Sequence, residues 1–192
     1  WMRVKYPHVI QGAIAASAPV FWFFESDVPE DVYDKITSRT FTNAGCDRKA
    51  VAAGWNAIDN LAKTDSGRKY LNDLFKLEEK SYLKNTNDAS FLKAFIREVF
   101  ESMVMVDYPY PTSFMSPLPG WPVKKACEFL KTPSNSDEKA AEALFNVANL
   151  YYNYTGKTTS LCANSAVCEG AFAVLGDPMG WPWQSCTEMV MP

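Results

Sequence analysis

Five prolines between residues 105 and 127 place the strongest constraint on how this chain can fold. Proline has no backbone N–H and holds φ near −65°, so most of this stretch can be neither helix interior nor central strand. We therefore predict an extended segment, the proline connector (residues 105–127). Aromatic side chains give it apolar surface with which to anchor itself, so we interpret it as one wall of a site. The prolines are Pro109, Pro111, Pro117, Pro119 and Pro122, and the aromatics are Tyr108, Tyr110, Phe114 and Trp121.

Apolar residues recur at helical spacing on both sides of this connector. Ser136 is a typical N-cap for the last of these patterns and Gly156 a typical end for it, while Pro122 suits a first helical position. We predict one compact helical layer with hardly a strand. Its helices are expected over residues 28–41, 46–63, 66–77, 88–105, 122–130 and 136–154.

The two ends of the chain follow different patterns. Residues 1–8 are predicted to be the end of a helix that Pro7 stops. Residues 9–24 form a nearly continuous run of small, apolar and β-branched residues, which favours a strand buried on both faces of a parallel sheet. Residues 158–192 show no sustained period, so irregular structure is expected there.

Composition excludes several classes of function. The net charge of −3 and the lack of a basic run argue against nucleic acid or an anionic membrane as a partner. An apolar fraction of 47% can bury a sizeable core, but no uninterrupted apolar run is long enough to predict a membrane span. The N-terminus lacks the zones of a signal peptide, and we expect both ends to be cut points.

Several short motifs, spread over nearly the whole chain, carry a specific resemblance. They are Trp1–His8, the sequence AASAP at 15–19, DYPY at 107–110, the segment from Pro117 to Cys127, and CTEMVMP at 186–192. In this order they resemble the lysosomal Pro-X carboxypeptidase family of serine peptidases, whose close relative is dipeptidyl peptidase II. The resemblance implies an α/β hydrolase with a helical cap insertion, of which this segment would be mainly α-helical with one or two core strands.

The resemblance also implies a division into domains. Residues 1–27 would be a piece of the hydrolase core, with the helix after the nucleophile elbow and the next strand. Residues 28–157 would form the helical cap, and residues 158–192 would return toward the core.

The implied activity is that of a serine exopeptidase that removes a C-terminal residue following proline. Residues 121–124 and 189–192 look more like Pro-X carboxypeptidase than dipeptidyl peptidase II. Two alternatives stay open: release of N-terminal X-Pro dipeptides, and a non-catalytic structural or assembling homologue. The expected partners are peptides with proline next to the scissile bond and further copies of the protein as a homodimer or higher homo-oligomer. The expected location is lysosomal or secreted, and no cofactor is expected.

No catalytic residue is assigned within the chain. A serine peptidase needs a serine, a histidine and an orienting carboxylate. His8, the single histidine, follows a helix end and is interpreted as structural, and Ser17 lacks the flanking glycines of a nucleophile elbow. Asp107 is interpreted as a capping or turn carboxylate, with shaping of the substrate channel as the alternative. The triad is therefore expected upstream of residue 1 and downstream of residue 192, and the chain alone is expected to lack peptidase activity.

The resemblance places one substrate contact in the chain. Met191 matches a methionine that lines the family's pocket for the proline ring, and a polarisable thioether suits a pyrrolidine. The alternative is an ordinary core methionine. Trp1 is interpreted as scaffold.

The cysteines, with a single histidine, have no zinc-site spacing, so no metal is expected and disulfides in an oxidising compartment fit better. The resemblance implies a bridge between Cys46 and Cys127, which would contribute roughly 4–5 kcal/mol by closing a loop of about 80 residues. A local bridge is predicted between Cys162 and Cys168. Cys186 matches a family cysteine whose partner lies beyond residue 192. A glycosylation sequon begins at Asn153.

Overall fold

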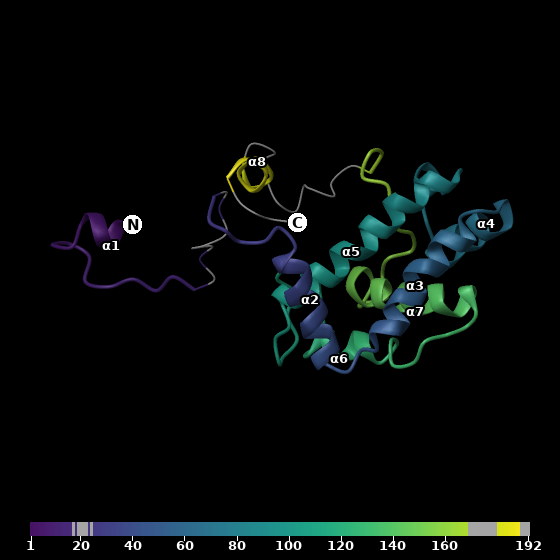
Figure 1. Cartoon of the computed structure of the whole chain (residues 1–192), viewed down its shortest axis with the longest axis horizontal. Coiled ribbons are helices and arrows are strands. Elements are labelled where there is room, and N and C mark those ends of the chain that lie inside the picture. Colours follow the sequence, from purple (N-terminus) through teal and green to yellow (C-terminus); the bar gives the residue numbers. More distant parts are fainter. Residues whose placement is uncertain (17, 19–22, 24, 169–179, 189–192) are drawn as a thin grey trace.

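The computed structural model describes residues 1–16, 18, 23, 25–168 and 180–188. Within them the regular secondary structure is almost entirely helical, and the β structure consists of isolated bridges (Figure 1). The α-helices are α1 (Met2–Lys5), α2 (Val32–Asn43), α3 (Arg48–Leu61), α4 (Asp65–Leu74), α5 (Ala89–Met105), α6 (Pro122–Cys127), α7 (Asp137–Tyr152) and α8 (Trp181–Thr187). Two 3₁₀ turns, Glu79–Ser81 and Thr86–Asp88, connect α4 to α5. The predicted helices are confirmed, with ends that differ by a few residues.

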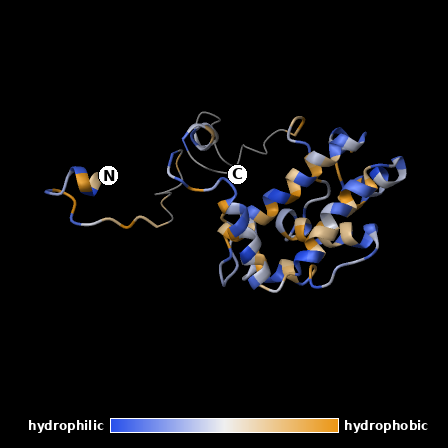
Figure 2. Cartoon of the chain, in the orientation of Figure 1, coloured by the Kyte–Doolittle hydropathy of each residue, from blue (hydrophilic) through white to orange (hydrophobic). Residues whose placement is uncertain are grey.

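Helices α2 to α7 pack around one hydrophobic core, with α3 lying against α7. Ile58, Ile96 and Leu144 are completely buried in it, and burial of a side chain of this size contributes about 1.5–3 kcal/mol. Gly54 lets α3 approach α7 closely, because a Cβ at this position would lie 2.5 Å from Leu144 Cγ. The helices are striped in hydropathy, as amphipathic packing requires (Figure 2).

Side chains at the helix starts explain where several helices begin. Asp47 accepts a hydrogen bond from the Lys49 N–H at 2.7 Å, and Thr64 Oγ1 accepts one from the Gly67 N–H at 3.0 Å. Ser136 accepts a hydrogen bond from the Lys139 N–H and is the N-cap of α7, as predicted. These contacts satisfy N–H groups that have no partner within the helix.

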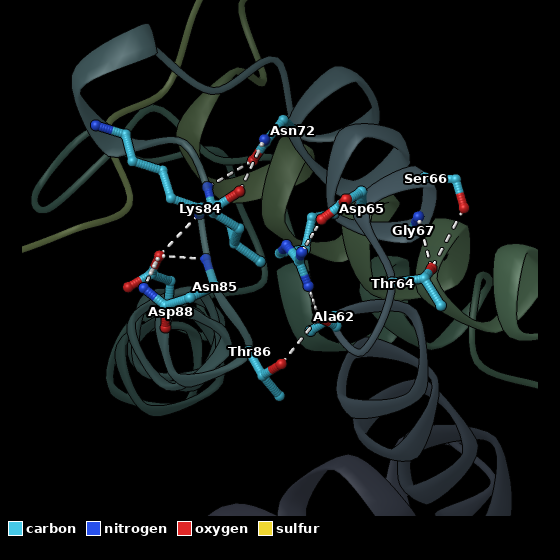
Figure 3. Close-up of polar contacts among 12 residues, drawn as sticks. Ala62, Thr64, Asp65, Ser66, Gly67, Asn72, Lys84, Asn85, Thr86 and Asp88 are labelled. Atoms are coloured by element: carbon cyan, nitrogen blue, oxygen red, sulfur yellow. Dashed lines mark hydrogen bonds and ion pairs between the residues drawn. The ribbon is translucent and has the colours of Figure 1, made fainter.

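A polar junction joins the end of α3 to the segment before α5 (Figure 3). The Ala62 carbonyl accepts from the Thr86 hydroxyl at 3.4 Å and from Arg68 at 2.6 Å. Buried Asn72 accepts from the Leu83 N–H at 2.8 Å. Each of these polar groups is hydrogen-bonded to a neighbour within the fold, so we interpret the junction as structural.

The strand predicted over residues 9–24 is not found in its described part. Residues 10–16 have no regular secondary structure, and Val9 and Ile14 are 69% and 99% exposed. Figure 2 shows this hydrophobic stretch outside the bundle. A strand buried on both faces needs paired strands beside it to satisfy its backbone, and none of the described residues supplies one. The helical part of the predicted fold is therefore confirmed, and the α/β-hydrolase core remains a prediction.

The expectation of irregular structure after residue 158 is wrong at its described end, where α8 forms over Trp181–Thr187. A proline lies in the first turn of α8 and presets its φ. Seven residues are too few to show a helical period in the sequence. No helix in the described ranges combines the length and apolar character needed to cross a bilayer.

Candidate functional site

The proline connector folds back on itself and is braced by backbone hydrogen bonds. Thr112 and Leu118 exchange two N–H···O bonds, of 3.1 and 2.8 Å, and the Trp121 N–H donates to the Tyr108 carbonyl at 2.7 Å. Gly120 permits this closure, because a Cβ there would lie 2.8 Å from the Pro109 carbonyl oxygen. The connector is thus a shaped loop, as its prolines predict.

Aliphatic side chains anchor this loop to the bundle. Leu118 is 1% exposed and Val123 is completely buried. The Ser116 hydroxyl donates to the Tyr151 carbonyl at 2.6 Å and so fixes the loop to α7. The sequence prediction that the aromatics provide the anchor is wrong, because the aliphatic side chains of the connector face the core instead.

The aromatics of the loop lie on its outer side. We call Tyr108, Tyr110, Phe114 and Trp121 the aromatic surface; their exposed fractions run from 41% to 80%. The rings of Tyr108 and Tyr110 stack with centroids 5.6 Å apart. Trp121 has φ of +53°, a left-handed conformation that is unfavourable for a bulky residue. Exposed, ordered aromatic faces suit contact with apolar groups such as proline rings.

Asp107 caps the helix that follows the connector. One of its carboxylate oxygens accepts from the Val123 N–H at 3.1 Å. Desolvation raises the pKa of Asp107, and the Val123 N–H opposes that rise. The carboxylate is committed to the start of α6, which is the capping arrangement rather than that of a free acid or base.

The other residues weighed for catalysis are not brought together in the described structure. His8 is exposed and meets the edge of the Tyr6 ring at 6.5 Å between centroids. Trp1 is fully exposed. Ser17 and Met191 lie outside the described residues, so the role of Met191 in a proline pocket stays a prediction. Among the described residues, no cluster of three or more metal-ligating side chains occurs.

Two disulfides are present. Cys46 and Cys127, 81 positions apart, join the α2–α3 turn to the end of α6, and Cys162 and Cys168 close a short loop. The Asp47 N–H donates to the Leu130 carbonyl beside the first bridge, at 2.8 Å. The connector and the α2–α3 turn are therefore covalently tied. Cys186 is an exposed free cysteine.

The sequon asparagine lies at the C-terminal end of α7. Asn153 Oδ1 accepts from the Thr158 N–H at 2.7 Å, and its Nδ2 donates to Asn149 Oδ1 at 3.2 Å. The side chain is half-buried beside exposed Tyr154 and Thr155. Glycosylation of Asn153 remains a prediction.

The sequence reasoning missed a groove between α2 and α3 with α5 beneath it. Its cavity volume is about 610 Å³, in the range of small-molecule and peptide sites. Val51 and Trp55 lie on the apolar stripe that helical spacing predicts for residues 46–63, yet both are half-buried and line this groove. The sequence did contain a signal for the groove. Arg48 lies on the same helical face as Val51 and Trp55, and a charged residue on an apolar stripe indicates that the stripe is open to solvent there.

Comparison with known proteins places residues 1–192 within the family model described as serine carboxypeptidase S28. The Caenorhabditis elegans protein named "Prolyl carboxy peptidase like protein 5" is 60% identical over 192 residues, which are all of this chain and 38% of that protein. The human "Lysosomal Pro-X carboxypeptidase" is 41% identical over 194 residues, covering all of this chain and 37% of that protein. The mouse protein of the same name is 38% identical, and this chain covers 38% of its length. The chain thus spans little more than a third of these curated relatives.

Proposed function

Because this chain belongs to the serine carboxypeptidase S28 family, we propose that it forms the helical cap and part of the substrate pocket of a proline-specific serine carboxypeptidase. The enzyme would remove a C-terminal residue that follows proline. Its catalytic serine, aspartate and histidine would lie outside residues 1–192. Residues 28–157 would be the cap, between the core piece at 1–27 and the return at 158–192.

The observation that carries this proposal is the similarity to proteins named Pro-X carboxypeptidase across the full length of the chain, at 38–41% identity in the human, orang-utan, bovine and mouse proteins. The described residues bring together no nucleophile, histidine and carboxylate.

The proline connector supports a role in substrate selection. Its backbone is braced, its aromatic surface is exposed, and the Cys46–Cys127 bridge ties it to the α2–α3 turn. A wall of this kind keeps its shape when an extended peptide binds, which lowers the entropic cost of binding. Met191 would complete the apolar contacts to the proline ring.

The proposed location is lysosomal or extracellular. Two disulfides fit an oxidising compartment, and several relatives carry "lysosomal" in their names. A glycan at Asn153 and assembly into a homodimer or larger homo-oligomer belong to the same proposal.

The test uses the full-length protein that contains this segment. A fluorophosphonate probe, followed by mass mapping of the labelled peptide, is expected to mark a serine upstream of residue 1. An N-blocked peptide ending in Pro-Phe should then lose phenylalanine. Release of Ala-Pro from a free N-terminus would instead support the dipeptidyl peptidase alternative. A folded protein that takes no label would support the non-catalytic alternative, and a label on Ser17 would show that the site is misplaced.

A further inference from the structure

The groove between α2, α3 and α5 has an apolar floor made of aromatic rings. Phe41 and Phe100 lie 4.8 Å apart between centroids, and Trp55 and Phe100 lie 6.2 Å apart. Phe41 and Phe100 are almost completely buried, whereas Trp55 and Val51 keep part of their surface open to the groove. This floor can receive a large apolar side chain.

The carboxylates on the rim are paired with cations of α5. Arg97 on α5 bonds to Asp34 on α2 at 3.0 Å and to Glu101 at 2.6 Å. Lys93 on α5 pairs with Asp59 on α3 at 2.8 Å. These pairs join α5 to both walls and set two cations against three carboxylates.

The wall formed by α2 and the start of α3 also carries two arginines that have no ion-pair partner among the described residues. Arg48 lines the groove and also a continuing hollow of about 360 Å³, which Arg39 lines as well. Both side chains are exposed, and no carboxylate of the described residues forms an ion pair with either. Arg48 lies on the α3 face that continues through Val51 and Ala52 to Trp55, so a cation and the apolar floor share one wall.

We propose that this groove binds the free C-terminus of a peptide whose last residue is large and apolar. The apolar side chain lies on Trp55 and Phe100, and the terminal carboxylate meets the guanidinium groups of Arg48 and Arg39. A guanidinium presents paired N–H donors that match the two oxygens of a carboxylate.

The rim favours a peptide over a fatty acid. Hydroxyl groups of Ser38 and Thr42 and the carboxylate of Asp34 line the same wall. These oxygens can accept hydrogen bonds from peptide N–H groups. An alkyl chain would remove water from them without offering any hydrogen bond in its place. The groove and the hollow that continues it therefore bring acceptors, an apolar floor and cations together, as binding of a peptide end requires.

The inference does not depend on the proposed peptidase activity, because it rests on the contacts of this groove alone. The connector and the groove are lined by different residues. A peptide bound here would not be positioned by the aromatic surface.

Calorimetric titration of the full-length protein with acetyl-Ala-Ala-Phe, which has a free carboxylate and no proline, tests the inference. We expect the free acid to bind at least tenfold more tightly than the same peptide as its C-terminal amide. Arg48→Ala should weaken binding of the acid about tenfold, as loss of a charged hydrogen bond does. Ala94→Trp, which fills the groove from an exposed position on α5, should abolish it.

Lys49→Ala is the matched control, because Lys49 is an exposed cation next to Arg48 that does not line the groove. Circular dichroism spectra and melting temperatures establish that each variant is folded. Equal binding of acid and amide, or equal affinity of Arg48→Ala and Lys49→Ala, would overturn the inference. Tighter binding of decanoate than of the peptide would overturn it in favour of a lipid ligand.

Discussion

The N-terminal segment and the helical bundle are both rich in apolar residues, yet the described part of the segment leaves them exposed and the bundle buries them. Ile14 is 99% exposed, whereas Leu144 on α7 is completely buried. The difference lies in the geometry of the pattern. A helix satisfies its own backbone and needs only one covered face, which a neighbouring helix can provide. An apolar run without a polar face needs partners on both faces and hydrogen bonds along both edges.

The largest expected effect comes from removing the Cys46–Cys127 disulfide, which cross-links the bundle. Replacing Cys46 and Cys127 by serine should lower the free energy of unfolding by about 4–5 kcal/mol, because the unfolded chain regains the entropy of a long loop. The matched control replaces Cys162 and Cys168, whose separation of six residues predicts only about 2 kcal/mol in the same treatment. Urea unfolding measures both. Equal losses would contradict the entropic account.

Two alanine substitutions test the contrast between the bundle and the N-terminal segment. Leu144→Ala should destabilise the bundle by about 2–5 kcal/mol, since it leaves a cavity in the core. Ile14→Ala should change stability by less than about 0.5 kcal/mol, as expected for an exposed side chain. Urea unfolding of residues 1–192 gives both values. A large loss from Ile14→Ala in the full-length protein would show that other parts of that protein cover this segment, as the predicted strand requires.

A smaller effect is expected at the contact of α2 with α5. The Tyr33 hydroxyl donates to the Glu101 carbonyl at 2.9 Å. Burial, with a contribution from the Glu101 charge, raises the pKa of Tyr33 to about 12. Below pH 10 the phenol is neutral in both states and the stabilisation is fully present. Above pH 10 it ionises in the unfolded chain first, so stability falls as the pH rises toward 12.

Tyr33→Phe should therefore cost about 1 kcal/mol at pH 7 and reduce the loss of stability between pH 10 and 12. Thermal unfolding across this pH range provides the measurement. Tyr154→Phe, at an exposed tyrosine, is the control. An unchanged alkaline profile for Tyr33→Phe would show that Tyr33 is not the titrating group.

The smallest effect concerns a polar group that the bundle leaves unsatisfied. Thr37 is 7% exposed, and its hydroxyl has no hydrogen-bond partner among the described residues. Thr37→Val keeps the shape and removes the desolvated hydroxyl, so it should raise the free energy of unfolding by up to about 1 kcal/mol. Thr42→Val, at an exposed position of the same helix, should have almost no effect. A destabilised Thr37→Val would indicate a partner for this hydroxyl in solution.

Local features were predictable because they depend on residues close together in the chain. Ser136 starts α7 by accepting a hydrogen bond within the first turn, and Pro122 suits the start of α6 because its ring fixes φ. The prolines of the connector predicted a shaped loop because they restrict φ wherever they occur. The α8 helix was missed because seven residues are too few to show a helical period.

Which side chains of the connector would face the core was not predictable, since that depends on the helices packed beneath it. Hydrophobicity suggested the aromatics, but Leu118 fits the space and the rings remain outside. The groove was missed for a related reason: helical spacing identifies the apolar face of α3 but not whether a neighbour covers it.

Helix positions, caps, the loop character of the connector and membership of a peptidase family thus follow from local sequence, because each rests on short-range sterics, hydrogen bonding or recognisable motifs. The exposure of the aromatic surface, the lack of ion-pair partners for Arg39 and Arg48 among the described residues, and the open groove were decided by tertiary packing. The physical reason is that burial and ion pairing are properties of a residue's neighbours in space, and those neighbours come from helices as far apart in the chain as α2 and α5.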